Sequence, residues 1–313
     1  MSGKAFKGRA NSSIPDNLLE SNVKMVLTRL GLSGVKHEVV GNKHQNYLGD
    51  IDLAVDKEDF EQRWVVQHFE GDDLWEGIKE ELELLKTTHK IIDYMIVKGW
   101  KQFHVLVPLV DEGFKETRGW KSSGGYLGKV VDDLQPGLIQ VDILVGNLDW
   151  MTRVQGSANT DSDWKALYRT NLLADAINLI ETTTKEGFNQ RLLMDYKDGI
   201  YMEEFVMVPP TGRQKNHQKK VVFKELLTSN PDDVGRILFG PFTWWADDLN
   251  SFEQVWELLN SKKFRYRTKN LIPILNKFKT RLEREHYPVP RVVMEKLGLE
   301  GGADECLVSP TPL

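Results

Sequence analysis

Cysteine is nearly absent from the sequence, since Cys306 is the only one among 313 residues. A single thiol excludes a disulfide within the chain and a zinc site built from several thiolates. Long hydrophobic runs are also missing: no apolar stretch reaches the length that crosses a bilayer, and residues 1–13 contain no apolar signal-peptide segment. We therefore expect a cytoplasmic protein with neither disulfides nor membrane spans.

Neither sign of charge dominates the chain, because 41 Lys and Arg stand against 46 Asp and Glu, a net charge of −5. The two signs are nevertheless unevenly distributed. Residues 1–210 contain 24 Lys and Arg against 33 Asp and Glu, whereas residues 211–299 contain 17 against 10. A local positive surface attracts nucleic acid even on an acidic protein, so the second of these segments is a candidate nucleic-acid interface.

Three aspartates stand out in the strand-like parts of the sequence. Residues 39–55, VVGNKHQNYLGDIDLAV, read as a strand, a polar loop and a second strand that carries Asp50 and Asp52. Side chains of a strand alternate between its two faces, so these two carboxylates share a face. Asp142 lies in a further apolar run at 139–145, which predicts a neighbouring strand that presents a third carboxylate beside them.

Three carboxylates on rigid strands suit Mg²⁺, or Mn²⁺ in its place, because hard divalent cations prefer oxygen ligands. The alternative is that Asp50 is a solvated turn residue, as aspartates at strand ends often are. Asp50 and Asp52 on one face repel each other unless a cation neutralises them. We therefore predict a metal site formed by Asp50, Asp52 and Asp142.

These residues resemble the nucleotidyltransferase superfamily. Gly41, the polar loop, Gly-Asp-Ile-Asp at 49–52 and Val-Asp-Ile at 141–143 are most similar to the palm of the family X DNA polymerases, the group of DNA polymerase beta. The resemblance extends from about residue 14 to about residue 201. It implies that Asp50 and Asp52 hold the nucleotide-binding metal, that all three aspartates hold a second metal, and that Asp142 accepts the proton of the attacking hydroxyl.

The same resemblance implies nucleotide-binding residues in two glycine-containing turns and a following helix. They are Gly41, Asn42, Lys43, Gly49, Gly156, Ser157 and Arg169. The family typically has Ser and then Arg in the first turn, where this chain has Asn42 and Lys43. Asn42 still donates hydrogen bonds, and Lys43 supplies a positive charge without the bidentate fork of Arg. Arg169 could equally be a solvated surface charge.

The remaining pattern predicts the order of elements. We expect a helix from Asp16 to Gly31, an amphipathic helix within 74–90, a strand within 101–110 with His104 inside it, and a helical pattern from Val221 onward. The predicted fold class is α/β (α+β), a polymerase-beta-like mixed sheet with helices, followed by a helical C-terminal domain. The expected divisions are a disordered 1–13, a nucleotidyltransferase core at 14–150, a thumb-like region at 151–208, a basic helical domain at 209–300 and a flexible tail at 301–313.

Two clusters of basic residues are candidates for phosphate contacts of a nucleic acid. They are Arg213, Lys215, Lys219 and Lys220 in the first cluster, and Lys262, Lys263, Arg265 and Arg267 in the second. Charge runs of this kind are often only solvated, and that alternative stays open.

The sequence therefore predicts a metal-dependent nucleotidyltransferase that moves a nucleoside monophosphate from a nucleoside triphosphate to a hydroxyl, most simply a DNA or RNA 3′ end. One alternative is a nucleotidyltransferase whose acceptor is a protein, a small molecule or a second nucleotide. The other is a non-catalytic nucleic-acid-binding or assembly protein of the same fold, which the replacements at Asn42 and Lys43 favour.

Overall fold

The computed structural model describes most of the chain, and the observations below refer to that part. The described residues are 5–6, 14–40, 47–48, 50–68, 74–116, 137–155, 172–178, 180–184, 188–209, 217–240, 252–261, 271–284 and 289–301. They form two compact units, one up to Thr152 and one from Arg153 onward. The predicted disorder of 1–13 and 301–313 falls almost wholly outside these residues, and the thumb-like region and basic helical domain stay predictions.

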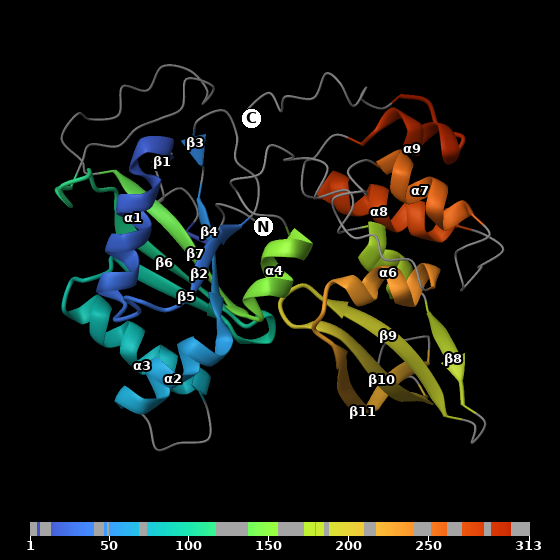
Figure 1. Ribbon diagram of the computed structural model, residues 1–313, viewed down its shortest axis with the longest axis horizontal. Helices are drawn as coiled ribbons and strands as arrows, with labels where there is room; N and C mark the ends of the chain where they lie inside the picture. The colour runs from blue at the N-terminus through green and yellow to red at the C-terminus, as the bar shows by residue number, and fades with distance from the viewer. Residues whose placement is uncertain are drawn as a thin grey trace. The chain divides into compact units, whose positions relative to one another are not determined.

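Unit 1 is built on a five-stranded mixed sheet with the order β2-β4-β7-β6-β5 (Figure 1). The central pair β4 and β7 is parallel, and the other three pairs are antiparallel. The strands are β2 (His37–Val40), β4 (Ile51–Asp56), β5 (Asp93–Val97), β6 (Gln102–Pro108) and β7 (Leu138–Gly146). A separate short pair joins β1 (Ile14–Pro15) to β3 (Tyr47–Leu48). A mixed sheet with helices confirms the α+β class expected from the sequence.

One face of the unit 1 sheet is covered by three helices, α1 (Asp16–Arg29), α2 (Lys57–His68) and α3 (Leu74–Thr87). Alternate residues of the strands, such as Ile51, Leu53 and Ile143, are fully buried against them. In this layer the ring of Trp64 stacks on those of Phe60 and Phe103, whose own rings are tilted to each other, with centroids 5.1 to 6.2 Å apart. The predicted helices at 16–31 and within 74–90, and the predicted strand within 101–110, are confirmed.

A buried polar clamp fixes α1 against the end of β6. The side chain of Asn22 donates hydrogen bonds to the carbonyls of Leu18 and Val110 and accepts one from the Val110 N–H. Each polar atom of the amide thus has a partner, which a fully buried amide requires. The helix ends at Arg29 and is capped by Leu30, and Gly31 follows with a positive φ of 69° that favours glycine.

The opposite face of the sheet is partly covered by α4 (Leu148–Gln155). Met151 of this helix packs in a small buried cluster with Val40, Ala54 and Leu144.

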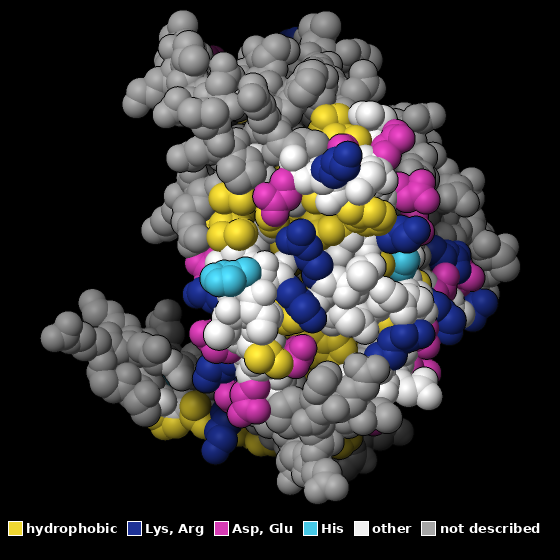
Figure 2. Space-filling model, turned by 90° about the vertical axis from the view of Figure 1, so that its left-hand side faces the viewer, with side chains coloured by type: hydrophobic (Ala, Val, Ile, Leu, Met, Phe, Trp, Pro, Cys, Tyr) yellow, Lys and Arg dark blue, Asp and Glu magenta, His cyan; other side chains and the backbone are white. Residues whose placement is uncertain are grey.

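Seen from the side of α1 and α3, the described surface carries Lys and Arg side chains among Asp and Glu side chains (Figure 2). That view therefore shows a surface of mixed charge. Between β5 and β6 the chain forms a short 3-10 helix, η1 (Lys98–Trp100).

Unit 2 contains an antiparallel four-stranded sheet with the order β11-β10-β9-β8. Its strands are β8 (Glu181–Thr183), β9 (Asn189–Asp195), β10 (Gly199–Val208) and β11 (Gln218–Thr228). Charges of opposite sign alternate across it, since Glu203 on β10 pairs with Arg191 on β9 at 2.7 Å and with Lys224 on β11 at 3.4 Å. The helical pattern predicted from Val221 is wrong as far as Thr228, because these residues continue β11 and pair with β10.

The described helical segments of unit 2 are residues 172–177, α6 (Asp232–Phe239), α7 (Phe252–Asn260), α8 (Ile272–Arg284) and α9 (Arg291–Lys296). Their buried side chains include Leu172, Ile177, Val234, Leu238, Leu259, Leu275, Phe278 and Val293. Lys277 on α8 lies 2.9 Å from the fully buried Asp175, which ties α8 to the helix at 172–177. No described helix is both long and apolar enough to cross a membrane.

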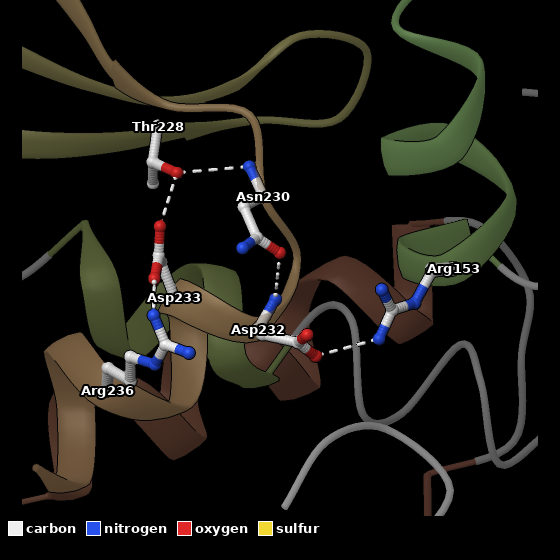
Figure 3. Close-up of polar contacts among 6 residues, drawn as sticks. All are labelled: Arg153, Thr228, Asn230, Asp232, Asp233 and Arg236. Carbon is white, nitrogen blue, oxygen red and sulfur yellow. Dashed lines mark hydrogen bonds and ion pairs between the residues drawn. The ribbon is translucent and has the colours of Figure 1, made fainter. Parts of the chain in front are cut away.

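The start of α6 is held by a polar network (Figure 3). Asn230 accepts a hydrogen bond from the Asp232 N–H, and Arg153 donates to the Asp232 carboxylate at 2.7 Å. Thr228, at the end of β11, donates to Asp233 at 2.6 Å. Acidic groups at a helix N-terminus stabilise it because they face the positive end of the helix dipole, so this network fixes where β11 ends and α6 begins.

Candidate metal centre

Three carboxylates meet at the centre of the unit 1 sheet. Asp50 directly precedes β4, Asp52 lies on β4, and Asp142 lies on β7. One oxygen from each of the three groups lies within 4.8 Å of the other two. Asp52 and Asp142 are register partners in the parallel pair, so the backbone itself brings them side by side.

The local sequence determines the face on which these carboxylates lie. Ile51 and Leu53 are fully buried in the layer under α1, α2 and α3. Since the side chains of a strand alternate, Asp50 and Asp52 must point to the other face. Both are partly buried, whereas Asp142 is only 3% exposed. The predicted shared face of Asp50 and Asp52 and the neighbouring strand of Asp142 are confirmed.

The chemistry of the three groups fits a divalent cation. Two carboxylates 4.8 Å apart repel each other by about 3 to 4 kcal/mol at an effective dielectric constant of about 20. A Mg²⁺ or Mn²⁺ ion would offset this repulsion and take the carboxylate oxygens as ligands. The three carboxylates offer only oxygen ligands, as hard cations prefer. The buried amide oxygen of Gln140, two residues before Asp142 on β7, has no hydrogen-bond partner among the described residues.

Asp142 has two further buried neighbours. Nε2 of Gln140 donates a hydrogen bond to Asp142 Oδ1 at 2.7 Å. Nδ1 of His104 lies 2.7 Å from the same oxygen, although its direction falls short of an aligned hydrogen bond. Gln140 is fully buried and His104 is 4% exposed. The contact to His104 follows from strand pairing, because His104 on β6 is the antiparallel register partner of Asp142.

The functional environment of Asp142 was therefore only partly visible in the sequence. The sequence predicts an interior or edge position for His104, and the structure buries it, but the sequence does not predict its contact with Asp142. The available signal was two polar residues, Gln102 and His104, at alternate positions of an otherwise apolar strand. Their position beside Asp142 depends on β6 being the neighbour of β7, which no local pattern in the sequence specifies.

The predicted nucleotide-binding residues lie outside the described part of the chain. They are Gly41, Asn42, Lys43, Gly49, Gly156, Ser157 and Arg169. The same holds for most predicted nucleic-acid contacts, namely Arg213, Lys215, Lys262, Lys263, Arg265 and Arg267. Their roles stay predictions.

Lys219 and Lys220 are the two predicted nucleic-acid contacts that the structure describes, and both lie on β11. Lys219 is opposite Met207 and Lys220 is opposite Val206, so the two side chains point to different faces of the sheet. Lys219 pairs with the Glu181 carboxylate, and its Nζ lies 4.7 Å from the centre of the Phe205 ring. Its charge is therefore already balanced within unit 2.

No protein-family model and no curated protein matches the sequence. The functional reading therefore rests on the geometry of the three carboxylates and on the motifs that surround them in the sequence.

Proposed function

We propose that the protein is a metal-dependent nucleotidyltransferase with a polymerase-beta-like palm in unit 1. It transfers a nucleoside monophosphate from a nucleoside triphosphate to a hydroxyl group and releases pyrophosphate. The observation that carries the proposal is the convergence of Asp50, Asp52 and Asp142 on adjacent parallel strands, with one oxygen of each within 4.8 Å of the others. Gly-Asp-Ile-Asp at 49–52 adds the sequence motif that accompanies such carboxylates in this superfamily.

In the proposed reaction the three aspartates hold Mg²⁺ or Mn²⁺. The cation supplies charge stabilisation for the triphosphate and acidifies the acceptor hydroxyl. The hydroxyl oxygen forms a bond to the α-phosphorus, and the bond from that phosphorus to the oxygen of the leaving pyrophosphate breaks. Asp142 accepts the proton of the attacking hydroxyl, the role that the resemblance to the family X DNA polymerases implies for the carboxylate of β7. The three carboxylates thus bind and orient the metal, and Asp142 also accepts a proton.

We further propose that the acceptor is the 3′ end of a nucleic acid. The excess of 17 Lys and Arg over 10 Asp and Glu in residues 211–299 supports this choice. A protein, a small molecule or a second nucleotide is the alternative acceptor, and the identity of the labelled product separates these cases. The replacements at Asn42 and Lys43 support a third case, a binding protein that transfers nothing.

The experiment that tests the function combines the full chain with Mg²⁺ or Mn²⁺, labelled nucleoside triphosphates and a mixture of acceptors. Extension of a labelled oligonucleotide supports the nucleic-acid acceptor, and label on a different molecule supports the alternative transferase. Asp142→Asn is the variant that should lose activity, since it removes one charge from the centre and keeps the shape of the side chain. Equal transfer by this variant and by the wild type contradicts the proposal.

A further inference from the structure

We propose that His104 is a positioning residue for Asp142: it holds one carboxylate oxygen so that the other is directed to the metal. This inference rests on the proposed function, because it takes Asp142 to be a metal ligand. Its basis is the row of facing residues Asp52, Asp142 and His104 on the three adjacent strands β4, β7 and β6. All three point to the face of the sheet that carries the metal centre.

The two carboxylate oxygens of Asp142 are not equivalent. Oδ1 accepts a hydrogen bond from Gln140 Nε2 at 2.7 Å and lies 2.7 Å from His104 Nδ1. Oδ1 thus accepts one N–H group and has a ring nitrogen at 2.7 Å, so its lone pairs are less available to a cation than those of Oδ2. Oδ2 is then the ligand atom that the arrangement favours, and Asp142 binds the metal through a single oxygen.

The neighbour of His104 determines which ring nitrogen faces Asp142 as a donor. Nε2 of Gln102 lies 3.2 Å from Nε2 of His104. We infer that this amide nitrogen donates to the histidine Nε2, which places the ring proton on Nδ1. Gln102 and His104 are two residues apart on β6 and therefore lie on the same face. The chain of contacts Gln102 to His104 to Asp142 thus presents an N–H to the carboxylate.

Burial gives this contact its effect. His104 is 4% exposed and Asp142 is 3% exposed, so water competes little for the carboxylate oxygen. Groups that orient a metal ligand from behind typically contribute 10-fold to 100-fold to metal affinity or activity. A histidine that merely fills the interior contributes to folding but leaves metal affinity unchanged. The two roles therefore differ in a measurable quantity.

The test measures Mn²⁺ binding to the full chain by electron paramagnetic resonance, without nucleotide. His104→Phe keeps a buried ring and removes the donor, and we expect its Mn²⁺ Kd to rise by about 10-fold to 100-fold. His104→Asn places an amide nitrogen where Nδ1 lies, so its Kd should stay within about threefold of the wild type. Phe103→Leu is the matched control: it destabilises the opposite face of the same strand and should leave the Kd unchanged.

Equal Mn²⁺ affinity of His104→Phe and the wild type overturns the positioning role, and so does an equal loss in His104→Asn and His104→Phe. A second measurement requires no folded variant. Nitrogen NMR of the wild type with labelled histidine should find the His104 proton on Nδ1, and a proton on Nε2 alone overturns the proposal.

Transfer assays separate this inference from the proposed function. Mn²⁺ binding that depends on His104, in a protein that transfers no nucleotide, supports the positioning role and contradicts the transferase. Active nucleotide transfer together with unchanged Mn²⁺ affinity in His104→Phe supports the transferase and contradicts the positioning role. A wild-type protein that binds no Mn²⁺ overturns both.

Discussion

Asp52 on β4 and Asp142 on β7 face each other directly across a parallel pair of strands. Their neighbours in sequence, Ile51 and Ile143, are fully buried on the other side of the same sheet. A slip of one residue in either strand moves a carboxylate into the apolar layer and an isoleucine out of it. The register that brings Asp52 and Asp142 together is therefore fixed by hydrophobic packing, without help from a metal.

The three aspartates should be required for activity, and without metal their mutual repulsion should lower the stability of the fold. We expect Asp52→Asn to lower nucleotidyl transfer by at least about 100-fold, because loss of a metal ligand removes several kcal/mol of transition-state stabilisation. Without metal, the same variant should unfold at an equal or slightly higher temperature, since it relieves repulsion from Asp142. Turnover assays and thermal unfolding by circular dichroism measure the two effects.

Glu80→Gln serves as the control for Asp52→Asn. Glu80 is an exposed carboxylate in the middle of α3 in the same unit, so its replacement should change neither quantity appreciably. Full turnover in Asp52→Asn would show that the acidic cluster is not the reactive centre.

Some parts of this arrangement could be read from the sequence and others could not. The shared face of Asp50 and Asp52 follows from the period of a single strand, which is a local property. The contact between His104 and Asp142 depends on which strands are neighbours, and β6 and β7 are separated by about thirty residues of chain. The sequence predicts a helical pattern from Val221 onward, but pairing with β10 determines the conformation of this residue.

Gly199, at the start of β10, should tolerate no side chain. Its φ is 143°, and an added Cβ would lie 2.1 Å from the carbonyl oxygen of Thr228 on β11. We expect Gly199→Ala to lower the free energy of unfolding by at least about 2 kcal/mol. This loss is the sum of the backbone strain and the cost of displacing β11.

Gly298→Ala separates the two contributions. Gly298 has a φ of 69° and no atom within 4 Å of an added Cβ, so only the strain of about 1 kcal/mol applies. Urea unfolding of both variants measures the difference. Equal losses would mean that β10 and β11 move apart at no cost.

Tyr94 on β5 should make stability depend on alkaline pH. Partial burial and the hydrogen bond to the Glu83 carboxylate raise the pKa of Tyr94 to about 12, from a model-peptide value near 10. The folded state thus retains the proton longer than the unfolded state. The resulting stabilisation is complete below about pH 10 and is lost as pH rises through about 12.

The difference in unfolding free energy between the wild type and Tyr94→Phe, followed by urea titration, should therefore shrink between about pH 10 and 12. Glu83→Gln is the informative second variant, because it keeps a hydrogen-bond acceptor at 2.8 Å and removes the charge. Its pH dependence should be weaker than that of the wild type. A pH-independent difference between wild type and Tyr94→Phe would show that the two states release the Tyr94 proton alike.

The basic residues of unit 2 should not contribute equally to nucleic-acid binding. Each phosphate contact of a double-stranded nucleic acid lowers the slope of log K against log salt by about 0.9. Simultaneous neutralisation of the second cluster should therefore weaken binding and reduce the slope by up to about 3 to 4. That cluster is Lys262, Lys263, Arg265 and Arg267.

Lys219→Ala is the control that the structure offers for this experiment. The Lys219 ammonium already pairs with Glu181 and lies over the Phe205 ring, so it is not expected to bind a phosphate. Lys219→Ala should therefore leave the salt slope unchanged. Fluorescence titrations of single- and double-stranded oligonucleotides at two salt concentrations measure both variants. If the fourfold variant and the wild type give superimposable curves, the second cluster is a solvated surface, and the acceptor of the proposed transferase is then to be sought among proteins and small molecules.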